Sequence, residues 1–234
     1  MKHSKLLLSG VLGTLGTLSI ATLAPTPAPA ASPAPAALPT AGAMFEVTVT
    51  NLTRGQIISP VLVATHSRRA SFYELGEPAS PELGILAEDG DNAPLRAVLD
   101  ASSEVYETAS GAAGIPPGGS ETIMISSVPN RPLVSLAGMM ITTNDAFVSL
   151  DGAPLPLIGK RTYFVPGLDA GTEANSESCM YVPGPPCGSG GVHDPSPAEG
   201  YVHVSNGIQG IGDIPKDVYD WRNPAARIEV RRVY

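Results

Sequence analysis

Three acidic residues in the middle of the chain have the type and spacing to bind a metal ion. Asp169 and Glu173 lie four residues apart across an Ala-Gly-Thr bend, so a tight loop can direct both carboxylates at one point. If Asp145 comes from a neighbouring strand end, three carboxylates converge. Unpaired carboxylates raise one another's pKa, whereas a hard cation such as Ca²⁺ suits all-oxygen ligation. The spacing alone leaves open that all three are solvated turn residues or caps.

Two motifs around these carboxylates resemble the spondin N-terminal domain family, the type of domain found in F-spondin and mindin. They are Asn144-Asp145-Ala146-Phe147-Val148 and Leu168-Asp169-Ala170-Gly171-Thr172-Glu173. Further stretches that fit the family pattern are residues 45–53, 58–60, 76–80, 86–90 and 220–228. The resemblance therefore extends from about Phe45 to Tyr234.

The resemblance implies an all-β fold, a C2-like antiparallel β-sandwich with short helical connections. It also implies a calcium ion held by Asp145, Asp169 and Glu173. Two positions depart from the usual pattern: Ala146 replaces an aromatic residue, and Glu173 stands where Asp is frequent, which lengthens one ligand arm. Animal members engage cell-surface or matrix partners. We therefore expect a stand-alone secreted member of the family. Its ligand is expected on the cell surface, in the matrix or among glycans, and the sequence does not identify it.

The sequence around the carboxylates is itself typical of an all-β protein. The chain holds 25 Gly and 24 Pro, and short apolar runs recur between them. Residues 45–50 alternate apolar and polar, which predicts a half-buried strand. The longest apolar run, 133–143, is predicted to be a central strand that leads directly to Asp145. Further strands are predicted at 57–65, 122–125, 163–165, 201–205 and 227–233.

Helices are predicted to be few and short. Residues 81–88 could form one or two turns, and Asp91 could cap a second helix with Pro94 near its start. We expect both to be connections packed against an open end of the sandwich.

The N-terminal segment has the composition of an export signal. Met1-Lys2-His3-Ser4-Lys5 is basic, an apolar stretch follows, and small residues come next, so residues 1–30 are predicted to be a secretory signal peptide. Residues 31–43 form an Ala/Pro-rich linker and 44–234 the domain. An uncleaved membrane anchor is the alternative, which glycines 10, 13 and 16 disfavour. We expect a secreted or cell-envelope protein without a stable transmembrane span after signal cleavage.

The charge balance narrows the class of partner. All 22 acidic residues lie at or beyond Glu46, and removal of Lys2 and Lys5 with the signal leaves 12 basic residues, a net charge of −10. An acidic surface repels phosphate backbones, so nucleic-acid binding is not expected.

Cysteine and histidine residues offer further chemistry. Cys179 and Cys187 enclose a Pro/Gly-rich stretch in an exported protein, which predicts a disulfide; a redox or metal pair does not fit this spacing. A transition-metal site built from His193, Asp194 and His203 is an alternative use of these residues. His203 also falls at an alternating strand position, where a packed or surface histidine is common.

Motifs for catalysis are weak. The chain has no Gly-x-Ser-x-Gly elbow for a nucleophilic serine. Paired carboxylates could hydrolyse glycosides, but sugar sites normally add aromatic side chains on which the sugar stacks. Trp221 is the single Trp, and it is predicted to close one end of the core. We therefore expect no enzyme but an exported, calcium-binding β-sandwich that acts as an extracellular binding or adhesion module. The alternatives are a secreted hydrolase of polysaccharides or esters and a passive envelope protein. Asn51-Leu52-Thr53 forms a glycosylation sequon.

Overall fold

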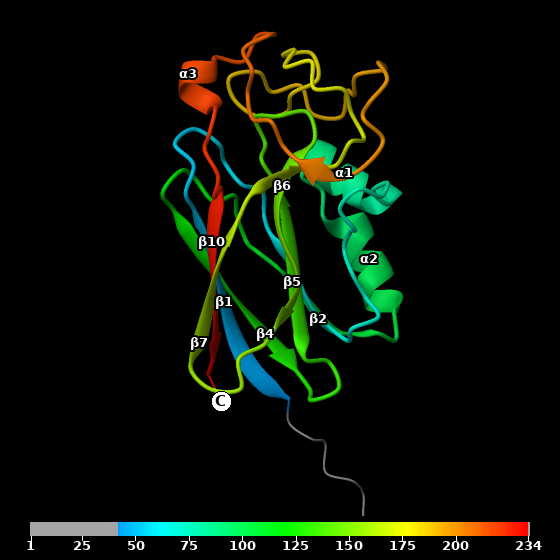
Figure 1. The fold of residues 1–234 in the computed structure, drawn as a ribbon, viewed down its shortest axis with the longest axis vertical. Coiled ribbons are helices and arrows are strands. Elements are labelled where there is room, and N and C mark those ends of the chain that lie inside the picture. The colour runs from blue at the N-terminus through cyan, green and yellow to red at the C-terminus, as the bar shows by residue number, and fades with distance from the viewer. Residues whose placement is uncertain (1–41, 234) are drawn as a thin grey trace, which may run out of the picture. The chain divides into compact units, whose positions relative to one another are not determined.

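The computed structural model describes residues 42–233, and these form two antiparallel β-sheets that face each other (Figure 1). The four-stranded sheet has the order β4-β1-β10-β7, and the six-stranded sheet the order β3-β2-β5-β6-β8-β9. The first contains β1 Ala43–Asn51, β4 Ser120–Ser127, β7 Lys160–Val165 and β10 Ala226–Arg232. The second contains β2 Leu62–His66, β3 Val105–Ser110, β5 Leu133–Met139, β6 Ala146–Pro154, β8 Gly167–Asp169 and β9 His203–Val204. This confirms the all-β sandwich, while the predicted signal peptide and the linker up to residue 41 lie outside the described residues.

The core between the sheets is built from alternating residues of the strands. In β1, Val47 and Val49 are fully buried and lie opposite Val230 and Ile228 of β10, which are buried as well. The alternation in the sequence therefore places one apolar face of each strand against the six-stranded sheet. Each such side chain contributes about 1.5–3 kcal/mol relative to an exposed one.

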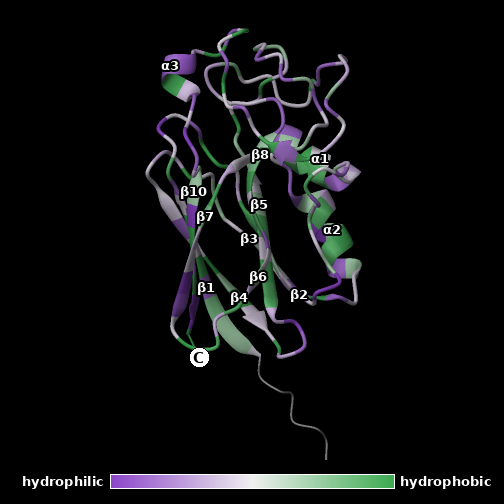
Figure 2. Cartoon of the chain, viewed as in Figure 1, coloured by the Kyte–Doolittle hydropathy of each residue, from purple (hydrophilic) through white to green (hydrophobic). Residues whose placement is uncertain are grey.

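The six-stranded sheet is apolar on both faces. In β5, Leu136 belongs to the core between the sheets, whereas Ala137 belongs to a second core on the outer face. Helix α1 (Pro81–Asp89) and helix α2 (Ala93–Ala101) cover this outer face with Leu83, Leu86, Leu95 and Leu99. Figure 2 shows hydrophobic residues along β5 and on the helices beside it. The expectation that the helices pack at an open end of the sandwich is therefore wrong: a two-sided apolar strand needs a cover on each side.

The helix boundaries follow from local capping. Ser80 accepts a hydrogen bond from Leu83 N through its hydroxyl and Pro81 begins α1, which ends at Gly90 in the left-handed conformation. Asp91 precedes the N-cap of α2, which is Asn92, and its carboxylate accepts a hydrogen bond from Ala93 N. A third helix, α3 (Lys216–Tyr219), is a single turn.

Asn51, the last residue of β1, fixes the turn that follows it. Its Nδ2 donates to the carbonyl oxygens of Gln56 (2.7 Å) and Ile115 (2.9 Å). Its Oδ1 accepts from Thr53 N (2.9 Å) and from Thr53 Oγ1 (2.7 Å). The side chain is fully buried, and its amide group is saturated by these four bonds.

Long loops between β8 and β10 gather at one end of the sandwich (Figure 1). The disulfide Cys179–Cys187 closes one of these loops, as predicted. The ring of Trp221 is buried and lies so close to Gly167 that a Cβ there would be 2.8 Å from its Nε1. This confirms that Trp221 closes the core at this end.

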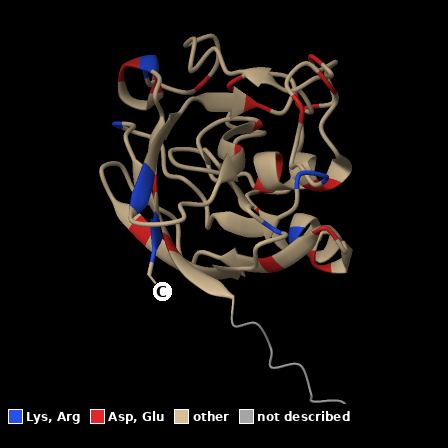
Figure 3. Ribbon diagram, turned by 60° about the horizontal axis from the view of Figure 1, so that its bottom comes forward, with Lys and Arg blue, Asp and Glu red and all other residues tan. Residues whose placement is uncertain are grey.

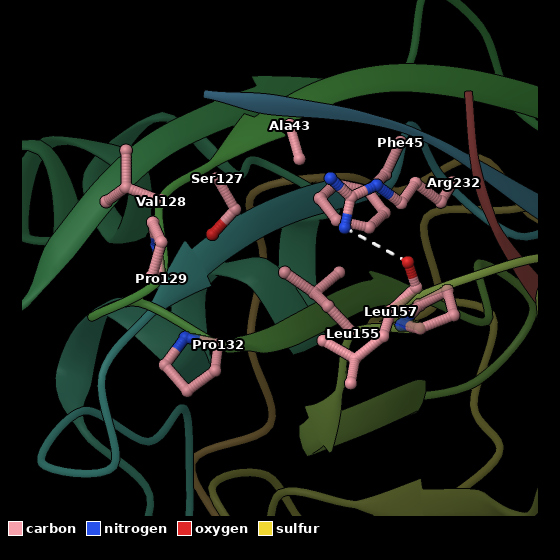
Figure 4. A pocket seen from close by; sticks show the side chains of 10 residues that line it. Ala43, Phe45, Ser127, Val128, Pro129, Pro132, Leu155, Leu157 and Arg232 are labelled. Carbon is pink, nitrogen blue, oxygen red and sulfur yellow. Dashed lines mark hydrogen bonds between the residues drawn. The ribbon is translucent and has the colours of Figure 1, made fainter. Parts of the chain in front are cut away.

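The other end of the sandwich, where β1 begins and β10 ends, holds a groove of about 280 Å³ (Figure 4). Phe45, Val128, Pro132 and Leu155 line it, and Arg232 donates a hydrogen bond to the carbonyl oxygen of Leu157 at its rim (3.0 Å). The groove is largely apolar and lies away from the acidic loops. Within residues 42–233, no helix has the length and apolar character needed to cross a membrane.

Candidate metal centre

Asp145 lies in the short loop between β5 and β6 and is directed toward the loop that follows β8. Its Oδ2 accepts hydrogen bonds from Thr172 N (2.8 Å) and Glu173 N (3.1 Å). Its Oδ1 is buried and has no hydrogen-bond partner. One oxygen of Asp145 thus holds the acidic loop, while the other stays available.

Asp169 is brought to the same place by strand pairing. It ends β8 and lies opposite Ala146 in β6, and the next residue, Ala170, donates its N–H to the carbonyl oxygen of Asp145 (3.2 Å). Its Oδ1 accepts from Gly171 N (2.9 Å), and its Oδ2 accepts from Asn175 Nδ2 (2.8 Å). Asp145 immediately precedes β6 and Asp169 ends β8, so the condition stated from the sequence, that Asp145 comes from a neighbouring strand end, is met.

The bend between Asp169 and Glu173 depends on Gly171. This glycine has a φ of +65°, and a Cβ at its position would be 2.3 Å from the carbonyl oxygen of Tyr201. A side chain at residue 171 would therefore be strained and would also collide with the backbone before β9.

Glu173 is buried as well, but its carboxylate has a different environment. Its Oε1 accepts from Asp194 N (2.7 Å) and Asn144 Nδ2 (3.3 Å), whereas its Oε2 is buried without a partner. The charged neighbours that act on it are Glu88 and His193. The structure thus joins the backbone of Glu173 to Asp145, while the Glu173 carboxylate is held by a separate loop. The ligand atoms of Asp145, Asp169 and Glu173 therefore do not all lie within 4.8 Å of one another.

The three carboxylates are unusually buried for charged groups: Asp145 is 0%, and Asp169 and Glu173 are each 1%, exposed. Desolvation, together with the charge of Asp169, raises the pKa of Asp145 to about 8. Desolvation likewise raises the pKa of Asp169, and it raises that of Glu173 to about 7. Each carboxylate is therefore costly to ionise where it lies.

Compensating positive side chains are missing from this part of the chain. No Lys or Arg occurs between Thr162 and Pro215, whereas six acidic residues do; acidic residues are red in Figure 3. Among residues 42–233, no Lys or Arg forms an ion pair with Asp145, Asp169 or Glu173. Buried carboxylates with two orphaned oxygens, Asp145 Oδ1 and Glu173 Oε2, fit a hard divalent cation.

Two further residues lie near Asp169 that the sequence analysis did not group with it: Glu199, which was not a candidate, and His203, which was assigned to a different set. In the part of the chain that the structure describes, one set of three potential metal-ligating side chains has its ligand atoms within 4.8 Å of one another: Asp169, Glu199 and His203. His203 lies directly opposite Asp169 in the pairing of β8 with β9. The strand pattern at 201–205 placed His203 in a strand, but no sequence signal told which strand it would meet.

The alternative transition-metal set of His193, Asp194 and His203 is not brought together. The imidazole of His193 lies between Glu88 Oε2 (3.3 Å) and Asp89 Oδ1 (3.2 Å) on α1. Asp194 instead accepts a hydrogen bond from Ser196 N. His203 is therefore grouped with Asp169 and Glu199.

The fold and the site together are those of an antiparallel β-sandwich that carries buried acidic residues in the loops at one end. The family model described as Spondin_N matches residues 52–181, more than half of the chain, so the chain belongs to the Spondin_N family. No match was found among curated proteins. The matched segment contains Asp145, Asp169 and Glu173, whereas Glu199 and His203 lie beyond it. Family membership and the disulfide indicate an extracellular protein.

Proposed function

We propose that this domain is an extracellular binding or adhesion module whose acidic loops are fixed by Ca²⁺. Asp145, Asp169 and Glu173 are the proposed ligands. The observation that carries the proposal is the fully buried Asp145, whose Oδ1 has no partner while its Oδ2 holds the loop backbone. A cation at Oδ1 would offset the desolvation of the carboxylate without breaking the bonds to the loop.

The ion is proposed to act on structure rather than on a reaction. The loops after β8 form one end of the sandwich, and Asp145 ties the β5–β6 connection to the first of them. Neutralising these carboxylates would rigidify the surface that the loops present. Burial of all three carboxylates also argues against the alternative of a hydrolase, because a general acid or nucleophile must reach its substrate.

Thermal unfolding with Ca²⁺ or with chelator tests the metal part of the proposal. We expect Ca²⁺ to raise the midpoint of the wild-type protein and to leave that of Asp145→Asn unchanged. Asp217→Asn, on the exposed face of α3, serves as the matched control and should respond like the wild type. An absent response in the wild type, or an equal response in Asp145→Asn, would contradict the calcium site.

A binding screen tests the module. Arrays of cell-surface glycans and matrix proteins should retain the protein in Ca²⁺ and release it in chelator, because the loops are proposed to need the ion. Turnover of a polysaccharide or ester that is lost in Asp145→Asn would instead favour the hydrolase.

A further inference from the structure

We infer that Asp169, Glu199 and His203 form a histidine-containing site for a divalent transition cation, for which Zn²⁺ is the matching probe. The inference goes beyond the calcium proposal. It shares Asp169 with that proposal but does not require that calcium binds.

The geometry of the set comes from the pairing of two short strands. Because Asp169 and His203 are direct partners in the β8–β9 ladder, their side chains project from the same face. His203 Nε2 lies 3.3 Å from Asp169 Oδ1. Two ligands bound tetrahedrally to Zn²⁺ at about 2.0–2.2 Å lie roughly 3.4 Å apart. This pair already has the spacing of two zinc ligands.

The tautomer of His203 directs a lone pair at the site. Its Nδ1 lies 3.0 Å from the carbonyl oxygen of Val204, and since a carbonyl only accepts, Nδ1 carries the hydrogen. With the hydrogen on Nδ1, Nε2 is the nitrogen left to bind a metal ion, and it is shielded from solvent and makes no hydrogen bond. A ring N–H donated to a backbone carbonyl is the usual arrangement of a metal-ligating histidine.

The carboxylates are held in place for a shared ligand. Asn175 Nδ2 donates to Asp169 Oδ2 (2.8 Å) and to Glu199 Oε1 (3.2 Å), which ties the two acidic side chains together. The ring of Tyr201 lies beside the imidazole at a centroid distance of 5.3 Å. Glu199 is exposed, so an ion could enter from solvent on its side.

A second observation points to a cation at the same place. Asp145 is fully buried, and its Oδ1 is unpartnered. It lies next to Asp169, because the following residue, Ala146, pairs with Asp169 and the carbonyl oxygen of Asp145 accepts the N–H of Ala170 (3.2 Å). The three grouped ligands thus lie beside a residue with a buried, unpartnered oxygen, and among the described residues no Lys or Arg forms an ion pair with Asp145, Asp169 or Glu199.

The donor atoms select the class of ion. Imidazole nitrogen suits Zn²⁺ and its transition-metal neighbours, whereas Ca²⁺ takes oxygen ligands. A site with one imidazole and two carboxylates therefore favours Zn²⁺ over Ca²⁺, in contrast to the all-oxygen set of Asp145, Asp169 and Glu173.

Calorimetric titration of the untagged, chelator-treated protein with Zn²⁺ tests the inference. We expect the wild type to bind Zn²⁺, and His203→Gln and Glu199→Gln each to weaken binding by about tenfold or more. His193→Gln, which removes a histidine paired with α1, is the matched control and should bind as the wild type does. Titration with Co²⁺ should give a visible absorption band that His203→Gln loses. Equal binding by the wild type and both site variants would overturn the inference.

The same variants separate this inference from the calcium proposal. His203→Gln should keep the Ca²⁺-dependent rise in the midpoint. Glu173→Gln, at a proposed calcium ligand outside the histidine-containing set, should lose that rise while still binding Zn²⁺. If the Ca²⁺ shift is absent but Zn²⁺ binding depends on His203, the calcium proposal fails alone. If Ca²⁺ stabilises but no Zn²⁺ binds, only the present inference fails.

Discussion

At the scale of single residues, Asp145 carries two separate roles on its two oxygens. Oδ2 accepts two backbone N–H groups of the acidic loop, which favours the ionised form, while burial and Asp169 oppose it. Burial and the charge of Asp169 dominate, because the pKa of Asp145 is raised to about 8. A bound cation would favour the ionised form of Asp145, so binding of the ion and ionisation of this carboxylate should be coupled.

This balance predicts how the stability of the chelated protein depends on pH. The pKa values of Asp145 and Glu173 are raised to about 8 and about 7 from 3.8 and 4.5. A raised pKa in the folded state means that folding takes up protons. The free energy of unfolding that these two groups contribute is therefore full below about pH 4, falls as pH rises, and is lost once pH has passed the folded pKa values of about 7 and 8. We expect the midpoint in chelator to fall over this range, with a change of about 2–4 °C for each kcal/mol.

Asp145→Asn provides the control for the pH profile. Asparagine can accept the same loop N–H groups but does not ionise, so this variant should show a shallower decline and exceed the wild type in chelator at pH 9. Saturating Ca²⁺ should flatten the wild-type profile. A chelated wild type whose midpoint rises between pH 5 and pH 8 would contradict the assigned direction of the shifts.

At the scale of elements, the bend at Gly171 connects the acidic loop to the edge of the six-stranded sheet. Gly171→Ala would place a Cβ 2.3 Å from Tyr201 O in a left-handed conformation. Gly159 has the same φ of +65°, but a Cβ added there would have no other atom within 4 Å, so Gly159→Ala isolates the cost of the backbone conformation. We expect Gly171→Ala to lose about 1–3 kcal/mol more than Gly159→Ala in urea unfolding. Equal losses would mean that contact with Tyr201 is unimportant.

The elements also show what sequence patterns can predict. β1 and β10 were predicted well because each buries one face, so apolar and polar residues alternate along them. The run that contains β5 was predicted as central because it is apolar on both faces. The position of α1 and α2 was not predicted correctly, since the apolar face of a helix does not indicate which surface of a sheet it will pack against.

The site was predictable to the extent that it is local in sequence. The bend from Asp169 to Glu173 and the strand end before Asp145 are short-range features. The contact of His203 with Asp169 depends on pairing across a long loop. Glu177 was missed too, although its buried carboxylate accepts hydrogen bonds from the N–H groups of residues 209, 210 and 211. Such contacts exist only after the loops have folded against one another.

At the scale of the whole molecule, charges are distributed unevenly between the sandwich and its loops. On the four-stranded sheet, two of the three acidic residues have basic partners: Glu229 pairs with Lys160 and Glu46 with Arg231. The buried acids of the loops have no Lys or Arg partner among the described residues. The strand framework can therefore fold without a metal ion, whereas the loop end depends on other sources of stability.

The disulfide is one such source. Cys179 and Cys187 are separated by eight residues, and closing so short a loop is worth about 2–3 kcal/mol. We expect reduction to lower the thermal midpoint by about 4–12 °C. The double variant Cys179→Ser/Cys187→Ser should unfold near the reduced wild type and should not respond to reductant. A reduced protein with an unchanged midpoint would contradict this role.

The saturated amide of Asn51 has a consequence for how the protein can be produced. The nitrogen that would carry a sugar is the atom that donates to Gln56 and Ile115 inside the core. An oligosaccharide there would leave two carbonyl oxygens unpaired and would have no room beside β1. In a eukaryotic secretory pathway, transfer of the sugar and closure of this turn would compete for the same chain. A cell without that modification avoids the competition altogether.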